Sequence, residues 1–219
     1  MTGRRFDPTL YLVTDPALAR GRALTDLVVA AVRGGVTLVQ LRDKHAGGRA
    51  LLETARALKA VLDPEGVPLI VNDRADVAHA AGAGCHVGQS DLPAAAARAI
   101  LGPDAVLGIS IDAVEQARAL DPALVDYVAF GPFAATATKP DAGAPIEADG
   151  LSAVRRQMAT LPLVAIGGID PRNVAAAVRA GADGVAVVSA IMAADDPEAA
   201  SRALRRAIDA TKAEVEKAL

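Results

Sequence analysis

The sequence predicts a single (β/α)8 TIM barrel, an α/β fold, and three observations lead to this prediction. Eight short apolar runs alternate with helical patterns along the chain, roughly one run per 25 residues, as in barrels built from βα units. Most of these runs are continuously apolar, which is typical of parallel strands covered on both faces. The chain has 219 residues, and a barrel of about 200–250 residues is routinely one unit. We therefore expect residues 1–219 to form one domain.

The predicted strands are short segments rich in valine, isoleucine and leucine. They are expected at residues 10–14, 38–42, 69–71, 85–87, 106–110, 127–130, 163–166 and 184–188. Between them, apolar residues recur with the helical period, as at Leu24, Leu27, Val28 and Ala31, which form one stripe. The alternation of these two periods gives the strand and helix order of a barrel.

Cap and turn residues mark the predicted element boundaries. Asp170-Pro171 and Asp196-Pro197 each indicate an N-cap followed by proline at the first helical position. Glycine-containing helix ends lead directly into strands in three places. A doubly wound open sheet is the alternative on pattern alone, but the first strand–helix turn, residues 14–16, lacks the glycine-rich fingerprint of a dinucleotide-binding fold.

Composition and charge argue against several classes of function. The net charge is −3, so no overall positive field favours nucleic acid or an anionic membrane. No apolar run reaches the roughly 18–20 residues of a membrane span, and residues 1–8 do not look like a signal peptide. The single cysteine, Cys85, permits no disulfide within the chain, which favours a cytoplasmic location. We expect a soluble protein acting on small molecules, and the sequence leaves homo-oligomerisation open.

The polar residues of greatest interest follow the predicted strands, where barrels hold their active sites. Gln40, Arg42 and Lys44 lie at alternate positions at the end of the second predicted strand. Because alternate residues of an extended chain share one face, all three side chains can point into the barrel mouth. Arginine offers a planar fork of donors and lysine a point charge, a combination suited to a phosphate or diphosphate group. The alternative interpretation is a solvated cluster of rim charges paired with Asp43.

Two aspartates follow the third and fourth predicted strands, opposite the basic cluster. Mg²⁺ is typically held by one or two carboxylates, with water and phosphate oxygens completing its coordination. Asp73 and Asp91 therefore predict a Mg²⁺ site. Each also has an alternative structural role, because Asp73 can cap a helix that starts at Arg74 and Asp91 can cap the helix after Pro93.

The loops after the seventh and eighth strands predict a second anion site. They contain Gly167, Gly168, Val188 and Ser189. Loops at these positions commonly form a phosphate pocket from backbone N–H groups, and glycine lets the backbone approach the anion closely. A pair of glycines can equally serve a tight turn alone.

A long irregular stretch, residues 131–149, is predicted to close over the site. It carries two hydroxyls and an ammonium group at Thr136, Thr138 and Lys139, which suits a lid over an anionic ligand. A polar surface loop without function is the alternative.

The three histidines are expected to be structural or rim residues. None of His45, His79 and His86 pairs with a candidate nucleophile in the sequence pattern. The chain shows no HxxxH, CxxC or Ser-His-Asp arrangement, which argues against a zinc enzyme and an acyl-transfer hydrolase.

Taken together, five motifs resemble those of the thiamine phosphate synthase family, over about residues 10–194. They are Gln40-Leu41-Arg42-Asp43-Lys44, Asn72-Asp73-Arg74, His86-Val87-Gly88-Gln89-Ser90-Asp91-Leu92-Pro93, Gly131-Pro132 with Thr136-Ala137-Thr138-Lys139, and Ala165-Ile166-Gly167-Gly168-Ile169. The resemblance implies a Mg²⁺-dependent transferase of thiamine biosynthesis. Such an enzyme joins a hydroxymethylpyrimidine diphosphate to the nitrogen of a thiazole phosphate, releasing diphosphate.

The resemblance also implies roles for individual residues. The pyrimidine diphosphate would be bound by Gln40, Arg42, Lys44, Asn72 and Lys139, with Ser110 near the pyrimidine and Mg²⁺ on Asp73 and Asp91. The thiazole phosphate would be bound by Thr136, Thr138, Gly168, Val188 and Ser189. Ser110, Arg42, Lys44 and Lys139 would be the catalytic residues, because the reaction depends on stabilising a departing anion and placing the acceptor rather than on a strong base.

Two departures from the family pattern are present, and three other functions remain as alternatives. Asp112 stands where relatives often have histidine, and the loop lacks a proline often found before Thr136. A related thiazole tautomerase would lose the acidic pair and use that histidine. The second alternative is another phosphate-binding barrel, such as a sugar-phosphate epimerase or aldolase, and an aldolase would place a Schiff-base lysine inside a strand. A non-catalytic barrel, the third alternative, would have lost rim charges. The full set of charged residues favours the synthase.

Overall fold

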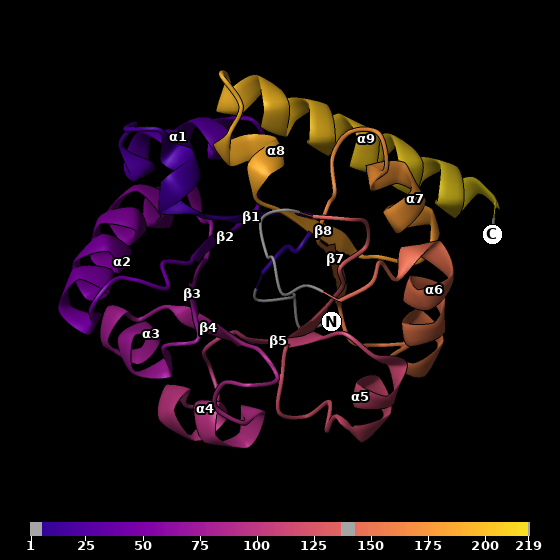
Figure 1. Ribbon diagram of the computed structural model, residues 1–219, viewed down its shortest axis with the longest axis horizontal. Coiled ribbons are helices and arrows are strands. Elements are labelled where there is room, and N and C mark those ends of the chain that lie inside the picture. Colours follow the sequence, from indigo (N-terminus) through magenta and orange to yellow (C-terminus); the bar gives the residue numbers. More distant parts are fainter. Residues whose placement is uncertain (1–5, 137–142, 219) are drawn as a thin grey trace.

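The eight strands close into one parallel barrel, as the sequence predicts. The computed structural model describes residues 6–136 and 143–218. Each strand pairs with its neighbours in chain order, and β1 pairs with β8 to close the ring. Figure 1 looks into this ring of strands, with the helices arranged around its outside. The fold class is therefore a (β/α)8 TIM barrel.

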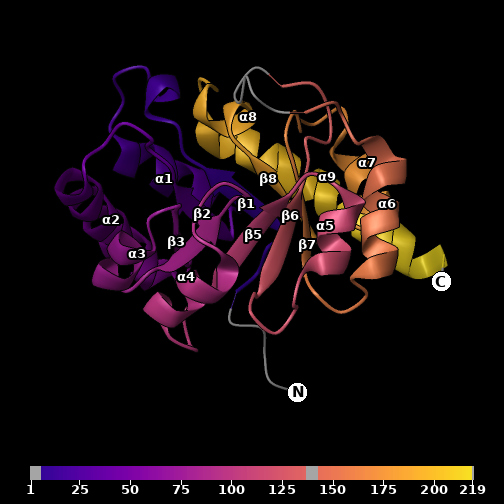
Figure 2. The ribbon, with the colours of Figure 1, turned by 60° about the horizontal axis from the view of Figure 1, so that its bottom comes forward.

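All eight strands lie at or within one residue of their predicted positions. They are β1 (Leu10–Val13), β2 (Leu38–Leu41), β3 (Leu69–Asn72), β4 (Gly84–Val87), β5 (Leu107–Ile111), β6 (Tyr127–Phe130), β7 (Leu163–Ile166) and β8 (Gly184–Val187). Their tilt within the shell of helices is visible in Figure 2.

Helices follow the strands around the barrel. They are η1 (Pro16–Ala19), α1 (Leu24–Arg33), α2 (Gly48–Leu62), η2 (Asp63–Glu65), α3 (Ala75–Ala81), α4 (Ala94–Leu101), α5 (Val114–Ala119), α6 (Glu147–Gln157), α7 (Val174–Arg179), α8 (Ser189–Met192) and α9 (Pro197–Ala218). Within the described ranges, no helix is both long and apolar enough to cross a lipid bilayer.

Of the two predicted proline starts, one is confirmed and one is wrong. Helix α9 begins at Pro197, and the Asp196 carboxylate accepts a hydrogen bond of 2.9 Å from the backbone N–H of Ala199. Helix α7 begins only at Val174, three residues after the predicted proline. The reason is that the Asp170 carboxylate accepts from the N–H of Arg172, which forms a turn before the helix.

Apolar side chains form two layers because neighbouring residues of a strand point to opposite faces. One cluster fills the space between the strands and the helices, and includes Leu10 and Leu12 of β1. The other fills the barrel itself, and includes Tyr11 and Val13 of the same strand. The interior is thus a packed core, and the active site of such a barrel must be built above it.

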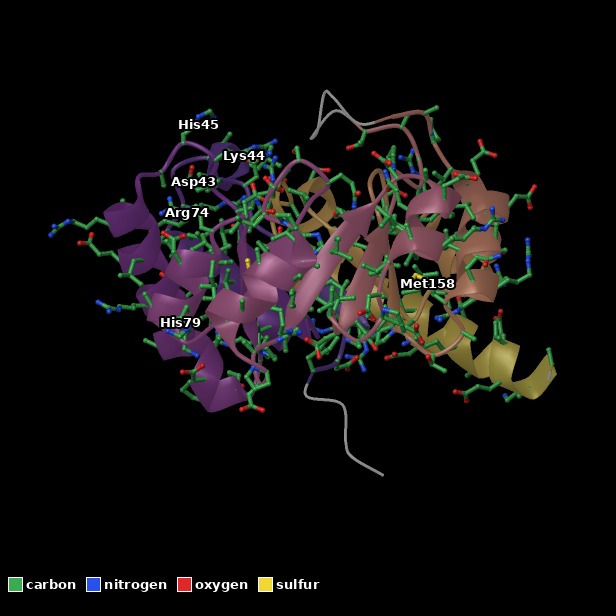
Figure 3. All side chains as sticks on the ribbon, turned by 90° about the horizontal axis from the view of Figure 1, so that it is seen from below. Asp43, Lys44, His45, Arg74, His79 and Met158 are labelled. Atoms are coloured by element: carbon green, nitrogen blue, oxygen red, sulfur yellow. The ribbon has the colours of Figure 1, made fainter. Side chains whose placement is uncertain are left out.

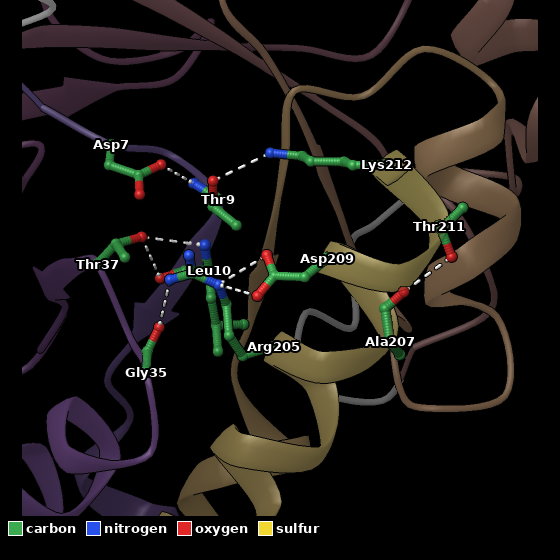
Figure 4. Close-up of polar contacts among 10 residues, drawn as sticks. All are labelled: Asp7, Thr9, Leu10, Gly35, Thr37, Arg205, Ala207, Asp209, Thr211 and Lys212. Carbon is green, nitrogen blue, oxygen red and sulfur yellow. Dashed lines mark hydrogen bonds and ion pairs between the residues drawn. The ribbon is translucent and has the colours of Figure 1, made fainter. Parts of the chain in front are cut away.

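The two ends of the barrel are built differently. Figure 3 shows Asp43, Lys44 and His45, in the loop after β2, at one edge of the molecule, whereas His79 of α3 lies towards the other edge. At the end where the strands begin, α9 fastens the chain (Figure 4): Arg205 donates to the carbonyl oxygen of Gly35, and Lys212 donates to the Thr9 hydroxyl at 3.0 Å. Ordered contacts thus secure the lower end, and the loops after the strands form the opposite end.

Candidate active site at the carboxyl ends of the strands

The strand register brings the predicted residues of strands β2 to β4 to one side of the mouth. Strand β2 pairs with β3 and β3 with β4, with Asn72 of β3 opposite His86 of β4. Arg42, Asp73 and Gly88 directly follow these three strands. Since parallel strands end at the same edge of a barrel, the basic and acidic groups predicted from the sequence lie in adjacent loops.

Burial decreases along the predicted basic series. The Gln40 residue is only 3% exposed and lies within the barrel, Arg42 is half-buried, and Lys44 is exposed on the rim. Asp43 accepts hydrogen bonds from the backbone N–H groups of His45 and Ala46, at 3.0 and 3.1 Å, and so shapes the loop. Asp43 thus bonds within its own loop, whereas the positive charges of Arg42 and Lys44 act on the carboxyl group of Asp73.

Asp73 and Asp91 face each other across adjacent loops. The pKa of Asp73 is raised to about 6, mainly by burial and in addition by its hydrogen bond with the Asp91 carboxyl and the charge of that group. Lys44 and Arg42 oppose this rise through their positive charges. Asp73 has a φ of 60°, in the left-handed region, so the backbone holds this carboxylate in a strained conformation.

Neither aspartate takes the alternative role of a helix cap. The N-cap residues of α3 and α4 are Arg74 and Pro93, and neither makes a side-chain cap hydrogen bond. Asp91 instead accepts from the backbone N–H of Gly88 at 2.8 Å, which holds one carboxylate oxygen within its own loop. The two carboxylates are thus positioned by the loops after β3 and β4, and neither caps the helix that follows.

The acidic pair fits a cation that keeps part of its water shell. Two carboxylates placed together repel each other unless a proton or a cation lies between them. Among residues 6–136 and 143–218, no group of three or more His, Cys, Asp or Glu side chains could form an all-protein metal cage. A pair of carboxylates is a donor set that commonly holds Mg²⁺ together with water and substrate phosphate.

The loop after β7 presses closely against the loop after β6. The backbone N–H of Ala134 donates to the carbonyl oxygen of Gly167 at 3.0 Å, and Phe133 donates to Ile166 at 2.8 Å. Gly168 has a φ of +65°, and a Cβ there would lie 2.6 Å from the carbonyl oxygens of Ala134 and Ala135. The glycine pair is thus required for contact between two loops, a role that the sequence interpretation did not include.

The structure describes some of the remaining residues predicted for the two anion sites. Val188 and Ser189 follow β8, which pairs with β7, so they lie beside the Gly167-Gly168 loop. Thr136 lies in the loop after β6, whereas Thr138 and Lys139 fall outside the described residues. The irregular stretch was predicted to extend to residue 149, but α6 already begins at Glu147.

Replacing Gly168 by alanine is expected to reduce both stability and activity. The positive φ and the two nearby carbonyl oxygens leave no room for a methyl group, so the loop at residues 133–136 must shift. We expect the free energy of unfolding, measured in urea, to fall by roughly 1–3 kcal/mol relative to the wild type. The control is Gly143→Ala, where a Cβ meets open space. Equal stability of the two variants would contradict the close contact.

Inside the barrel, the structure reveals polar residues that the sequence interpretation missed. His86 is 5% exposed, and its Nε2 lies 2.8 Å from Oγ of Ser110. His86 is thus a buried residue of β4, but its hydrogen bond to Ser110 was not part of the sequence interpretation, and His45 and His79 are exposed. Tyr11 and Tyr127, the only two tyrosines of the chain, are both fully buried beside His86 and Gln40. The two tyrosines within otherwise apolar strands were the sequence feature that could have indicated these interior polar contacts.

The fold and the site together define a class of protein, a TIM-barrel enzyme with charged groups at the mouth formed by its strand ends. A family model described as thiamine monophosphate synthase matches residues 10–191. The chain belongs to this family and is therefore a transferase.

Individual relatives cover nearly the whole chain. A thiamine-phosphate synthase of Azorhizobium caulinodans is 53% identical over 208 residues, which cover 94% of this chain and 98% of the relative. One of Xanthobacter autotrophicus is 57% identical with the same coverage. The solved structure of thiamine phosphate pyrophosphorylase from Pyrococcus furiosus has a TM-score of 0.86 at 32% identity, covering 94% of this chain and 98% of that one.

Proposed function

We propose that this protein is a Mg²⁺-dependent thiamine phosphate synthase. It joins the hydroxymethylpyrimidine group of a pyrimidine diphosphate to the nitrogen of a thiazole phosphate, and releases diphosphate. Membership of the family supports this reaction. The observation that carries the proposal is the pair of facing carboxylates, Asp73 and Asp91, with the charges of Arg42 and Lys44 beside them.

In this proposal, Asp73 and Asp91 hold the Mg²⁺ ion. When bound, the ion neutralises charge on the diphosphate group as that group departs. The protein supplies a matching set of donors, in which Arg42, Lys44 and Asn72 contact the diphosphate and Lys139 adds a further positive charge. Arginine provides two parallel N–H donors for the phosphate oxygens, and lysine provides a compact charge.

The reaction then requires little acid–base chemistry. The bond between the pyrimidine methylene carbon and the diphosphate oxygen breaks, and its electron pair leaves with the diphosphate. The lone pair of the thiazole nitrogen forms the new carbon–nitrogen bond. The amino group of the pyrimidine stabilises the positive charge that develops on the carbon, so catalysis depends on charge stabilisation and on placement of the two halves.

The acceptor half is proposed to bind on the far side of the mouth. Gly168, Val188 and Ser189 would contact its phosphate through backbone N–H groups, with Thr136 and Thr138 adding hydroxyls. Ser110 and Gln40 would contact the pyrimidine from the barrel interior. We further propose that the barrel is a single catalytic domain, located in the cytoplasm, that acts without nucleic acid or membrane.

The observed residues favour the synthase over the alternative enzymes. A tautomerase of this fold would lack the acidic pair, whereas Asp73 and Asp91 are both present and face each other. Asp112, at the position of the tautomerase histidine, is exposed. Lys44 also lies on the exposed rim beyond β2 and is not placed inside the barrel for a Schiff base.

Incubation of the purified protein with both phosphorylated halves tests the proposal. We expect a product with the mass of thiamine phosphate in the presence of Mg²⁺, and none when either half is omitted. Addition of EDTA is expected to stop the reaction and excess Mg²⁺ to restore it. Intact substrates after long incubation with Mg²⁺ would disprove the activity, and undiminished activity in EDTA would disprove the role of the metal.

A further inference from the structure

A chain of four hydrogen bonds crosses the barrel interior and connects two residues proposed to contact the pyrimidine. Gln40 Nε2 donates to the Tyr11 hydroxyl at 2.6 Å, and the Tyr11 and Tyr127 hydroxyls lie 2.8 Å apart. The Tyr127 hydroxyl lies 2.9 Å from His86 Nδ1, and His86 Nε2 lies 2.8 Å from Ser110 Oγ. The five side chains come from β2, β1, β6, β4 and β5, so the chain spans most of the barrel.

The side chains that surround this chain of hydrogen bonds are almost entirely apolar. Val13, Leu38 and Ile70 pack in the same interior cluster as the two tyrosines. Phe6 lies against the Tyr127 ring, with 5.4 Å between the ring centroids. In the described part of the protein, no buried side-chain nitrogen or oxygen lacks a hydrogen-bond partner. Since an unpaired polar group in such surroundings is costly, each member depends on its neighbours in the chain.

The chemistry of the members gives the chain a direction. The Gln40 nitrogen can only donate, so the Tyr11 hydroxyl accepts from it. In the bond between the two hydroxyls, Tyr11 is assigned as the donor, because its hydrogen would otherwise lack an acceptor among the apolar side chains around it. Tyr127 then donates to His86 Nδ1, which must carry no hydrogen. A neutral imidazole with a free Nδ1 carries its hydrogen on Nε2, which donates to Ser110.

The direction of the chain determines what Ser110 and Gln40 present above the barrel core. Ser110 accepts from His86, so its own hydroxyl hydrogen is available to point elsewhere. Gln40 uses its nitrogen towards Tyr11, so its amide oxygen lies on the other branch of the side chain. The backbone of Ser110 is also held, because its carbonyl oxygen accepts from Gln89 Nε2 at 2.7 Å.

We propose that Tyr11, Tyr127 and His86 are positioning residues, which fix Ser110 as a hydrogen-bond donor and Gln40 as an acceptor towards the pyrimidine. An aminopyrimidine has the complementary pattern, with a donor amino group beside an acceptor ring nitrogen. The chain thereby selects one orientation of the ring and directs its methylene carbon towards the second substrate. This inference rests on the proposed function for the identity of the ligand, but the proton arrangement is a property of the protein alone.

The first test measures the proton arrangement without any substrate. The double variant His45→Gln/His79→Gln removes the two exposed histidines and leaves His86 as the only histidine of the protein. In ¹⁵N-histidine-labelled protein we expect an NMR signal with a hydrogen on Nε2 and none on Nδ1. A hydrogen on Nδ1, or a doubly protonated ring, would overturn the proposal.

The second test removes one tyrosine hydroxyl from the chain of hydrogen bonds. Tyr127→Phe is expected to lower kcat/KM for the pyrimidine diphosphate roughly 10- to 100-fold, without changing KM for the thiazole phosphate. It should also disturb the tautomer of His86, because Nδ1 loses its donor. Tyr11→Phe breaks the chain at another point, and provides the same test if Tyr127→Phe folds poorly.

A matched control separates positioning from a general loss of stability. Thr211→Val also removes a buried hydroxyl, which donates to the carbonyl oxygen of Ala207 at 2.8 Å in α9, at the opposite end of the barrel. We expect this variant to lose some stability and to keep its kcat/KM. If the two tyrosine variants keep wild-type kcat/KM while the wild type makes thiamine phosphate, the inference is wrong and the proposed function stands. If the wild type makes no product, the function fails instead.

Discussion

Asp91→Asn is expected to lower kcat roughly 100-fold or more while leaving the protein folded. The substitution keeps an oxygen that can accept from the N–H of Gly88, but it removes one of the two charges proposed to hold Mg²⁺. Stabilisation of a departing anion commonly contributes a factor of about 10²–10³ to the rate. Steady-state kinetics at saturating substrates and increasing Mg²⁺ measure the loss.

Stability and a matched variant show whether the effect of Asp91→Asn is electrostatic. Without Mg²⁺, the midpoint of urea unfolding should stay the same or rise, because the variant no longer places two negative charges together. Asp112→Asn makes the same change at an exposed site after the next strand, and should keep full activity. Wild-type kcat in Asp91→Asn, or an equal loss in Asp112→Asn, would refute the metal role of Asp91.

Arg42→Gln is expected to lower kcat/KM for the pyrimidine diphosphate by roughly two orders of magnitude. The glutamine retains a polar side chain but loses the charge and the paired N–H donors that suit a diphosphate group. KM for the thiazole phosphate should be unchanged, because the two phosphates are proposed to bind over different strands. Initial rates with each substrate varied in turn provide the measurement.

The loss in Arg42→Gln must be specific to the mouth of the barrel. Arg56→Gln removes the same charge from the exposed face of α2, and we expect it to behave as the wild type. Arg42→Lys keeps the charge but not the fork of donors, so an intermediate loss is expected. A rise in KM for the thiazole phosphate alone would mean that Arg42 has been assigned to the wrong substrate.

The barrel was predictable because its strands are buried on both faces. Such strands appear in the sequence as continuous apolar runs, and all eight were found with boundaries correct to one residue. The start of α7 was not, because Asp170-Pro171 has the composition of a helix start but forms a turn through the carboxylate of Asp170. Local composition does not distinguish a helix start from a turn here, because the difference lies in which backbone N–H the aspartate accepts from: Ala199 at the start of α9, but Arg172 before α7.

The site was predictable where it follows from the ends of strands. Asp73 and Asp91 were placed together because adjacent parallel strands end at one edge, and the structure brings the two carboxylates face to face. The interior hydrogen bonds could not be predicted in the same way. They depend on the barrel register that places Tyr127 and His86 within reach of each other across strands distant in the chain.

Phosphorus NMR of a single reaction mixture follows the phosphates of both proposed anion sites at once, and so tests whether the enzyme transfers a group between two bound substrates. With enzyme, Mg²⁺ and both halves, we expect the pyrimidine diphosphate signals to be replaced by free diphosphate. The thiazole phosphate signal should persist as a monoester within the joined product, and neither half alone should change. Release of inorganic phosphate from either half, or release of diphosphate without the thiazole phosphate, would contradict a transfer between two bound substrates.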